Sequence, residues 1–180
     1  MSGARAVFLD RDGIINRSVV CDGKPYPPAC VEDVELIPGV EDAFSQLADH
    51  GYILIGITNQ PDVARGSQSK EQVEKINALI VSKLPLAEIL VCYHDDKDNC
   101  DCRKPMPGLI FRAAEQYQVD LSHSWMVGDR WKDIAAGAAA GLQTIFLDYQ
   151  YDEVYKGPQP TYTIITMMDI AKIILQKEIK

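Results

Sequence analysis

Residues 7–13 read Val7-Phe8-Leu9-Asp10-Arg11-Asp12-Gly13, an apolar run that ends in two aspartates and a glycine. Side chains at positions i and i+2 of an extended chain point to the same side, so the two carboxylates can converge just beyond the end of a strand. Two carboxylates this close do not both ionise without cost, and a cation bound to one leaves the other easier to protonate. The stretch therefore predicts a phosphoryl-transfer site with one nucleophilic and one acidic aspartate. The alternative is a simple turn, because Asp-Gly is a strong hairpin dipeptide.

The size of the chain predicts one domain. Its 180 residues are 47% hydrophobic, which is enough to bury one substantial core, and no linker rich in Ser, Gly or Pro divides residues 1–180. No apolar run approaches the roughly 18 residues that a membrane span needs. The first strand begins almost at the N-terminus and leaves no room for a signal peptide, so we expect a cytoplasmic protein without a membrane partner.

Charge and cysteine content narrow the possible partners. A net charge of −8 argues against a broad nucleic-acid surface, because binding a polyanion depends on clustered Lys and Arg. Any anionic ligand must therefore meet a local basic patch. Five cysteines in a reducing compartment indicate metal ligation or ordinary burial and not a disulfide framework. Cys21 and Cys30 stand alone and are expected to be free thiols. We expect a monomer, although the sequence carries no readable signal of oligomeric state.

Apolar segments alternate with helical patterns along the chain. Strands buried on both faces of a parallel sheet are almost continuously apolar. Runs of this kind cover residues 6–10, 52–58, 89–94, 125–129 and 144–148. Helical periodicity and capping signals predict helices from about residue 40 to Gly51, from Ser69 to Leu84, from Pro107 to Tyr117 and from Trp131 to Ala140. A short strand over 162–166 and a helix around 170–174 follow. The alternation predicts a doubly wound α/β fold with a mostly parallel sheet.

Notable polar residues follow the predicted strands at the end where such sheets bind ligands, outside the carboxyl ends. Asp10 and Asp12 follow the first strand, Thr58-Asn59-Gln60 the second, His94 the third and Asp129 the fourth. Read alone, Thr58 and Asn59 are more typical of a helix cap or a turn than of a binding site. At a shared rim, the Thr58 hydroxyl and nearby backbone amides are suited to hold phosphate oxygens.

The segment Gly128-Asp129-Arg130-Trp131-Lys132-Asp133 joins a strand to a helix. One interpretation makes Asp129 a helix N-cap and Asp133 a first-turn acid that complements the helix dipole. The other assigns Asp129 to a Mg²⁺ ion shared with Asp10, because Mg²⁺ favours hard oxygen ligands and is usually held by one or two carboxylates plus substrate phosphate. Asp133 then either contacts the metal or only orients the site.

A second metal site is predicted in the loop over residues 92–102. Two pairs of soft ligands, Cys92 with His94 and Cys100 with Cys102, are each spaced i, i+2 and are separated by five residues. This spacing can close around one tetrahedral Zn²⁺ as a Cys3His site, with no open position and hence a structural role. The alternative is three unrelated thiols and a solvated histidine.

The residues directly after this loop are basic. A lysine held at the rim is a good point-charge partner for a phosphoryl group, and an arginine can fork onto oxygen atoms. Arg103-Lys104-Pro105 is in this position, and a metal-pinned loop would tether it there. Together with Arg130, it supplies the local positive field that an acidic chain otherwise lacks. The alternative is a solvated Arg-Lys pair on the surface.

Four segments, in order, resemble the motifs of the haloacid dehalogenase superfamily of phosphatases, and they span most of the chain. Asp10-Arg11-Asp12-Gly13 resembles the first motif, Thr58-Asn59-Gln60 the second, Arg103-Lys104-Pro105 the third, and Gly128-Asp129 with Asp133 the fourth. The resemblance implies a Rossmann-like fold and a phosphoric monoester hydrolase that depends on Mg²⁺.

The same resemblance implies a role for each motif residue. Asp10 would attack phosphorus to form an aspartyl-phosphate, and Asp12 would protonate the leaving oxygen and later deprotonate water. Mg²⁺ would be held by Asp10, the backbone carbonyl of Asp12, and Asp129. Thr58 and Lys104 would stabilise the transferring phosphoryl group. The residues expected to bind substrate are Arg11, Asn59, Gln60, Arg103 and Arg130.

The metal loop placed before Arg-Lys-Pro narrows the resemblance to the heptose bisphosphate phosphatases and their histidinol phosphatase relatives. The implied substrate is a small sugar phosphate, foremost the 7-phosphate of D-glycero-D-manno-heptose 1,7-bisphosphate, with histidinol phosphate as the alternative. The segments between motifs are too short for a full cap domain, so the loop over 16–38 and the metal loop are expected to grip the substrate. The chain departs from that group in a short metal loop, in Pro61-Asp62 after the second motif, and in Arg130 where a lysine is common.

Two other functions are compatible with parts of the sequence. A phosphoacceptor receiver domain also combines acids, Mg²⁺, a threonine and a lysine at one end of a parallel sheet, but it retains its phosphate as a switch. The Asp10-x-Asp12 pair and the metal loop favour the enzyme. A zinc-dependent nucleic-acid module is suggested only by the Cys/His loop, and the acidic chain opposes it.

Overall fold

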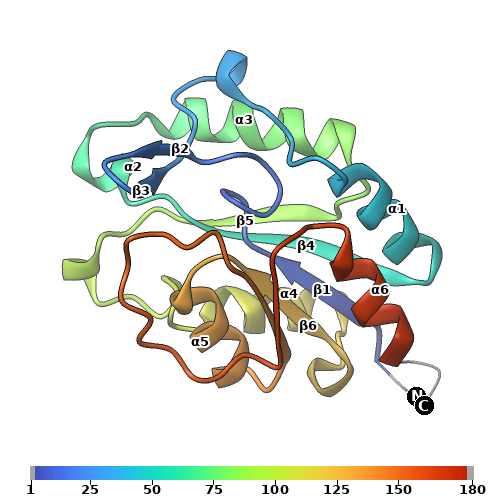
Figure 1. Ribbon diagram of the computed structural model, residues 1–180. Helices are drawn as coiled ribbons and strands as arrows, with labels where there is room; N and C mark the ends of the chain where they lie inside the picture. The colour runs from blue at the N-terminus through green and yellow to red at the C-terminus, as the bar shows by residue number, and fades with distance from the viewer. Residues whose placement is uncertain (1–2, 178–180) are drawn as a thin grey trace.

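The computed structural model describes residues 3–177, apart from the side chains of residues 21 and 24. Its centre is a six-stranded sheet in the order β5-β4-β1-β6-β7-β8, in which every neighbouring pair is parallel (Figure 1). The strands are β1 (Arg5–Leu9), β4 (Tyr52–Asn59), β5 (Glu88–Cys92), β6 (Trp125–Gly128), β7 (Gln143–Leu147) and β8 (Tyr162–Ile164). The predicted α/β fold with a mostly parallel sheet is confirmed.

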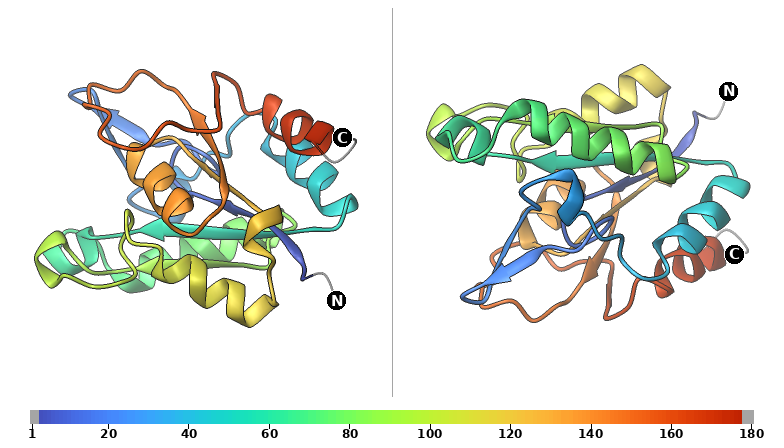
Figure 2. Two further views of the ribbon diagram at one scale, coloured as in Figure 1. Left: turned by 90° about the horizontal axis from the view of Figure 1, so that it is seen from below. Right: turned by 90° about the horizontal axis from the view of Figure 1, so that it is seen from above.

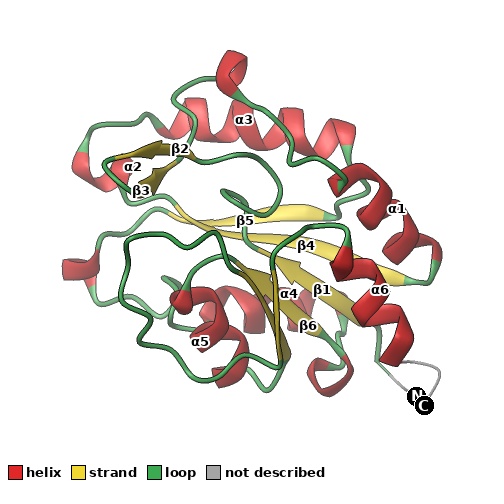
Figure 3. Cartoon of the chain, viewed as in Figure 1, coloured by secondary structure: helices red, strands yellow, loops and turns green. Residues whose placement is uncertain are grey.

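Helices cover both faces of this sheet (Figure 3). The helices on one face are α1 (Val40–Asp49), α3 (Lys70–Lys83) and α6 (Asp169–Gln176), and those on the other are α4 (Gly108–Tyr117) and α5 (Trp131–Ala139). On the first face, α1 and α6 lie side by side, cyan and red in Figure 2. The start of α3 is fixed by Ser69, whose hydroxyl accepts a hydrogen bond from the backbone N–H of Gln72 (3.1 Å), as the capping signal predicts.

The central strand β1 is continuously apolar because both of its faces are buried. Alternate residues of a strand face opposite sides of the sheet. Val7 and Leu9 pack into the cluster under α1, α3 and α6, whereas Ala6 and Phe8 pack into the cluster under α4 and α5. All four side chains are fully buried. Burial on both faces therefore fixes the strand, and Asp10 emerges at its carboxyl end.

A small antiparallel hairpin, β2 (Val19–Cys21) with β3 (Lys24–Tyr26), is a feature that the sequence analysis did not predict. Its turn is Asp22-Gly23, and both residues have positive φ, 50° and 73°, as a two-residue type I′ turn requires. The hairpin dipeptide is thus present ten residues after Asp12-Gly13. In Figure 1 the hairpin lies near α2 (Asp62–Arg65), at the end of the molecule where the strands of the sheet end.

The remaining elements are short, and the element boundaries differ only slightly from those predicted. Three 3-10 helices are η1 (Val31–Asp33), η2 (Asp96–Asp98) and η3 (Leu121–His123). Strand β5 ends at Cys92 instead of residue 94, and β8 ends at Ile164 instead of residue 166. Cys30 is a free thiol as expected, while the side chain of Cys21 lies outside the described residues. Within residues 3–177, no helix has both the length and the apolar character that crossing a membrane requires.

Candidate active site

A cavity of about 350 Å³ opens at the carboxyl ends of β1, β4 and β6. Ligand pockets for small molecules usually enclose about 300–1,000 Å³, so this cavity suits a small ligand. Its walls come from the segment after β1, the β2–β3 hairpin, the end of β4 with α2, the metal loop and the start of α5. The predicted site residues that line it are Asp10, Asp12, Thr58, Asn59, Arg103, Lys104 and Arg130.

Three buried carboxylates meet beside this cavity. One oxygen from each of Asp10, Asp129 and Asp133 lies within 4.8 Å of the others. Burial and the charge of Asp133 raise the pKa of Asp10 to about 7, against the lowering effect of Lys104. Burial and the charge of Asp10 raise the pKa of Asp129 well above its usual value. Anions gathered out of water need a compensating cation, and hard oxygen ligands suit a divalent ion such as Mg²⁺.

Asp129 and Asp133 differ in the partners of their oxygen atoms. Oδ2 of Asp129 accepts a hydrogen bond from Tyr151 (2.9 Å), whereas its Oδ1 is buried and has no hydrogen-bond partner among the described residues. Both oxygens of Asp133 are engaged, Oδ1 with Lys104 (2.7 Å) and Oδ2 with the backbone N–H of Arg130 (3.0 Å). The spare oxygen of Asp129 fits a metal ligand, while Asp133 is arranged to orient the lysine and the start of α5.

Lys104 is buried between two of these acids. Its Nζ lies 2.6 Å from Oδ1 of Asp10, 2.7 Å from Oδ1 of Asp133 and 2.6 Å from the carbonyl oxygen of Ile57. Burial alone would lower its pKa, but the two carboxylates raise it, so the ammonium stays charged. The Asn59 side chain donates to the Lys104 carbonyl and accepts from its N–H, both at 3.0 Å. Asn59 therefore positions Lys104, in addition to lining the cavity.

The carboxylate of Asp12 is held by three neighbouring side chains. Arg11 donates from Nε to Oδ1 (3.1 Å) and from Nη2 to Oδ2 (2.8 Å). Asn16 donates to Oδ1 (2.9 Å) and Gln60 donates to Oδ2 (2.8 Å). The Asp12 side chain is still 16% exposed, at the cavity wall. Asp12 is therefore both fixed in orientation and accessible to a ligand.

Arg11 and Gln60 are not among the residues that line the cavity, which does not fit the expectation that they bind substrate. The Arg11 side chain is fully buried, and its Nη1 donates to Asn77 of α3 (2.9 Å). Its guanidinium is held inside the protein, between Asn77 and the Asp12 carboxylate. Gln60 is also buried, and its amide nitrogen bonds Asp12 and the Thr58 hydroxyl (2.9 Å). Both residues support other site residues instead.

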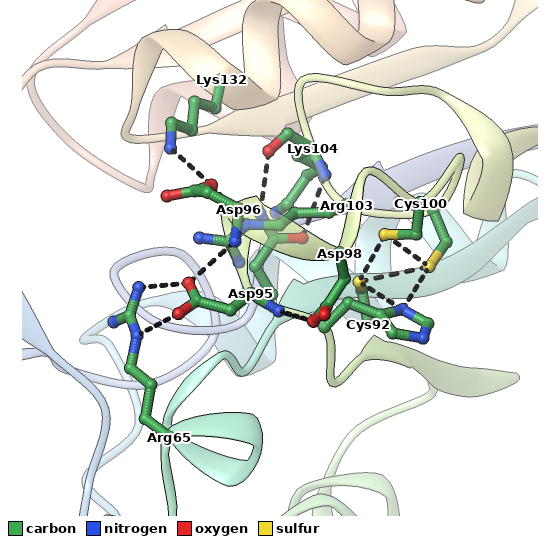
Figure 4. A network of polar contacts seen from close by, with 12 residues as sticks. Arg65, Cys92, Asp95, Asp96, Asp98, Cys100, Arg103, Lys104 and Lys132 are labelled. Atoms are coloured by element: carbon green, nitrogen blue, oxygen red, sulfur yellow. Dashed lines mark hydrogen bonds and ion pairs between the residues drawn. The ribbon is translucent and has the colours of Figure 1, made fainter.

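The four soft ligands of the metal loop come together as predicted (Figure 4). Sγ of Cys102 lies 3.2 Å from Sγ of Cys92 and 3.5 Å from Sγ of Cys100. Nδ1 of His94 lies 3.3 Å from Sγ of Cys102 and 3.6 Å from Sγ of Cys92. Ligands about 2.3 Å from one tetrahedral Zn²⁺ would lie about 3.8 Å apart, so the set needs only slight expansion around an ion. The sulfur atoms are too far apart for a disulfide.

Ion pairs tie the metal loop to the cavity wall, as Figure 4 shows. Asp95 caps η2 and forms two hydrogen bonds with Arg65 of α2, at 2.6 and 3.0 Å. Asp96 accepts from Nε of Arg103 (2.7 Å) and lies 3.9 Å from Nζ of Lys132. Nη1 of Arg103 is buried and has no hydrogen-bond partner among the described residues. Arg103 also lines the cavity, where its guanidinium contributes positive charge.

Sequence analysis missed one wall of the cavity, which belongs to the segment over residues 148–160 after β7. Asp152 and Glu153 line the cavity. Glu153 accepts two hydrogen bonds from Arg130, at 2.6 and 2.9 Å. The segment over residues 148–160 therefore joins the two predicted segments, the loop over 16–38 and the metal loop, in the wall of the cavity. The available signal was a pair of tyrosines, at positions 149 and 151, directly after a buried parallel strand.

Comparisons with known sequences agree with this arrangement. The profile of the family described as HAD-hydrolase-like matches residues 101–165. The chain is 35% identical over 154 residues to the D-glycero-beta-D-manno-heptose-1,7-bisphosphate 7-phosphatase of Haemophilus ducreyi, which covers 79% of this chain and 81% of that protein. It is also 35% identical over 151 residues to the protein of the same name from Escherichia coli K12, covering 77% and 76% of the two chains.

Solved structures extend the similarity to nearly the whole chain. The D,D-heptose 1,7-bisphosphate phosphatase from B. bronchiseptica, complexed with magnesium and phosphate, matches with a TM-score of 0.80 at 26% identity. That match covers 96% of this chain and 99% of the other. The corresponding phosphatase from Burkholderia thailandensis shares the fold, with a TM-score of 0.66 at 23% identity over 95% of this chain and 98% of the other.

Proposed function

This chain belongs to the haloacid dehalogenase-like phosphatases, and we propose that its substrate is the 7-phosphate of D-glycero-D-manno-heptose 1,7-bisphosphate. One observation carries the proposal. A buried lysine, Lys104, lies 2.6 Å from Asp10 beside the Asp129 and Asp133 carboxylates, at the edge of a cavity of about 350 Å³. This grouping provides a nucleophile, a place for a divalent cation and a fixed positive charge, which are the parts that phosphoryl transfer needs.

We assign Asp10 as the nucleophile and Asp12 as the proton carrier. Oδ1 of Asp10 accepts from Lys104 (2.6 Å) and from the backbone N–H of Arg11 (2.8 Å), so Oδ2 is the oxygen that attacks phosphorus. As the new bond to phosphorus forms, the bond to the sugar oxygen breaks, and Asp12 gives that oxygen a proton. Asp12 then takes a proton from water, which attacks phosphorus, releases phosphate and restores the Asp10 carboxylate.

Mg²⁺ would be held by Asp10, by the backbone carbonyl of Asp12, and by Oδ1 of Asp129, which has no hydrogen-bond partner among the described residues. Bound there, the ion would neutralise charge on the phosphoryl oxygens. Lys104 adds a positive charge from the side, and Asp133 orients Lys104 through its 2.7 Å ion pair. The Thr58 hydroxyl lies at the cavity wall and completes the set of donors. Gln60 and Arg11 act on these groups and not on the substrate, whereas Asn59 both holds Lys104 and lines the cavity.

The Cys92, His94, Cys100 and Cys102 cluster would hold a structural Zn²⁺. A closed set of four ligands leaves no position for substrate. Its effect on the reaction is therefore indirect. Cys102 directly precedes Arg103 and Lys104 in the chain, so the ion would help to fix the position of these two residues. Arg103, which lines the cavity, would then contact the part of the sugar remote from the reacting phosphate.

The proposal is tested by phosphate release in the presence of Mg²⁺, with Asp10→Asn as the blank. The panel contains both anomers of the heptose 1,7-bisphosphate, the heptose 7-phosphate, and histidinol phosphate. We expect kcat/KM for one bisphosphate anomer to exceed that for histidinol phosphate by at least about 10²-fold, since a second charged contact contributes a few kcal/mol. Comparable weak rates on every compound would contradict the assignment. A long-lived phosphoprotein would instead indicate a receiver-like switch.

A further inference from the structure

The chain turns sharply after β7 at residues 148–151, here termed the tyrosine turn. The Asp148 side chain accepts a hydrogen bond from the backbone N–H of Gln150 (2.8 Å), and Gln150 has a left-handed φ of 56°. A side chain that bonds the backbone two residues later is the usual support for such a turn. The turn places the rings of Tyr149 and Tyr151 5.6 Å apart, centroid to centroid.

The two phenol groups reach the ends of two neighbouring strands. Tyr151 donates to Oδ2 of Asp129 (2.9 Å), which follows β6. Tyr149 donates to the carbonyl oxygen of Gly13 (3.0 Å), in the segment that follows β1. Strands β1 and β6 are paired in the sheet. The tyrosine turn is therefore hydrogen-bonded to both of the segments that follow β1 and β6, which carry Asp10 and Asp129.

These two strand ends approach each other very closely. Gly13 has a φ of 99°, and a Cβ added there would overlap the Asp129 carboxylate. Glycine is therefore required at this position, both for its φ and for the space beside it. Each residue of this contact accepts a hydrogen bond from one tyrosine hydroxyl: the Gly13 carbonyl from Tyr149 and the Asp129 carboxylate from Tyr151.

We propose that Tyr151 is a positioning residue for Asp129: by occupying Oδ2, it holds the carboxylate so that Oδ1 faces the cation. The inference rests on the Mg²⁺ site proposed above. Oδ1 is the buried oxygen that has no partner among the described residues. Groups that hydrogen-bond a metal-binding carboxylate fix its orientation, and their loss typically weakens metal affinity 10- to 100-fold.

The test is Tyr151→Phe, which removes one hydroxyl and keeps the ring. We expect the affinity for Mg²⁺ alone, measured by calorimetric titration of the protein without substrate, to fall about tenfold or more. In turnover assays the Mg²⁺ activation constant rises by the same factor, kcat recovers at saturating Mg²⁺, and KM for the sugar phosphate stays within twofold. A merely structural tyrosine would instead lower the thermal midpoint without a Mg²⁺-dependent recovery.

Tyr155→Phe is the matched control. Its hydroxyl donates to the Pro158 carbonyl (2.6 Å) within the same segment, so its loss removes a tyrosine hydrogen bond that is not made to a carboxylate. Tyr149→Phe should weaken Mg²⁺ binding less than Tyr151→Phe, because it acts through the backbone of Gly13. The proposal is overturned if Tyr151→Phe binds Mg²⁺ within twofold of the wild type, or if Tyr155→Phe loses as much. A wild-type protein that binds no Mg²⁺ would overturn the metal site itself.

Discussion

The two clusters that could hold a metal are built in opposite ways. The carboxylate cluster draws Asp10 from one segment and Asp129 and Asp133 from another, more than a hundred residues further along the chain, and all three are buried. The Cys/His cluster comes from the single loop over residues 92–102. Assembling the first requires the whole sheet, whereas assembling the second requires only one loop. The first is consequently a product of the fold, and the second is a local support added to it.

The two clusters meet in one short stretch of chain. Cys102 is a soft ligand, and Lys104, two residues later, forms the 2.6 Å ion pair with Asp10. A loop that organises itself around an ion can therefore set the position of a charge in the distant cluster. The comparison predicts that damage to the carboxylates stops the reaction and leaves the loop intact, while damage to the loop weakens the reaction without stopping it.

The largest effect is expected from Asp10→Asn. Without the nucleophilic carboxylate, phosphate release should fall at least about 10⁴-fold, as losses of a nucleophile commonly do. Zinc content and the thermal midpoint should stay near those of the wild type, because the amide fits the same space and one repulsive charge is gone. Enzyme assays, metal analysis and calorimetry would measure these quantities. Residual activity above about 1% would refute the assignment of Asp10.

Cys100→Ser should have the next largest effect. Removing one soft ligand releases the zinc ion, and Lys104 loses its anchored position. A misplacement of about 1 Å can cost about 10²-fold, so we expect a fall of that order in kcat/KM, with Mg²⁺ binding retained. Cys30→Ser is the control, because Cys30 is free and half-exposed. Full activity after zinc loss would contradict the claim that the metal loop sets the position of Lys104 beside the carboxylates.

The pH dependence of Mg²⁺ binding tests whether a proton on the carboxylate cluster competes with the metal. The pKa of Asp10 is raised to about 7, so below pH 7 the metal must displace a proton. Mg²⁺ affinity should therefore fall up to about tenfold per pH unit below 7 and level off above about 8. The raised pKa also means that, without Mg²⁺, the folded state binds the extra proton, and Asp10 contributes less stability as pH rises from about 4 to 7. Calorimetric titration between pH 5.5 and 8.5 that gives a constant affinity would argue against this.

The smallest effect is expected from Arg65→Ala. The Arg65–Asp95 pair (2.6 Å) lies at the outer edge of the metal loop, and the Arg65 side chain is 46% exposed. Exposed pairs contribute about 1 kcal/mol or less, so the thermal midpoint should fall by no more than about 4 °C, with zinc retained. Lys75→Ala removes the exposed Lys75–Glu71 pair (2.7 Å), which lies outside both the metal loop and the cavity lining, and serves as control. Loss of zinc in Arg65→Ala would show that the loop does not organise itself.

The same contrast explains what the sequence could predict. Ligands within one loop are recognisable from their spacing, and the ends of parallel strands are recognisable because such strands are buried on both faces. The direction in which a side chain turns depends on distant partners. Arg11 was expected to contact substrate, yet it reaches Asn77 of α3. The tyrosine turn was missed because its partners, Gly13 and Asp129, are far away in the chain.

The hairpin was missed for a different reason. Asp-Gly occurs at 12–13 and at 22–23, and the dipeptide alone does not distinguish them. The first is followed by Ile14 and Ile15, which are fully buried, so the chain enters the core there. The second is flanked by three-residue strands that include the exposed Val19 and Val20. Strands this short, without an alternating apolar pattern, carry too weak a signal to be found.

The arginines around the cavity already have acidic neighbours: Arg65 pairs with Asp95, Arg103 with Asp96, and Arg130 with Glu153. An incoming anion that binds these guanidinium groups competes with the carboxylates already paired with them, except at Nη1 of Arg103, which has no hydrogen-bond partner among the described residues. Exchange of one singly charged anion for another gains little, whereas a doubly charged phosphate gains more from the same guanidinium groups. These guanidinium groups therefore favour a doubly charged phosphate over a singly charged anion.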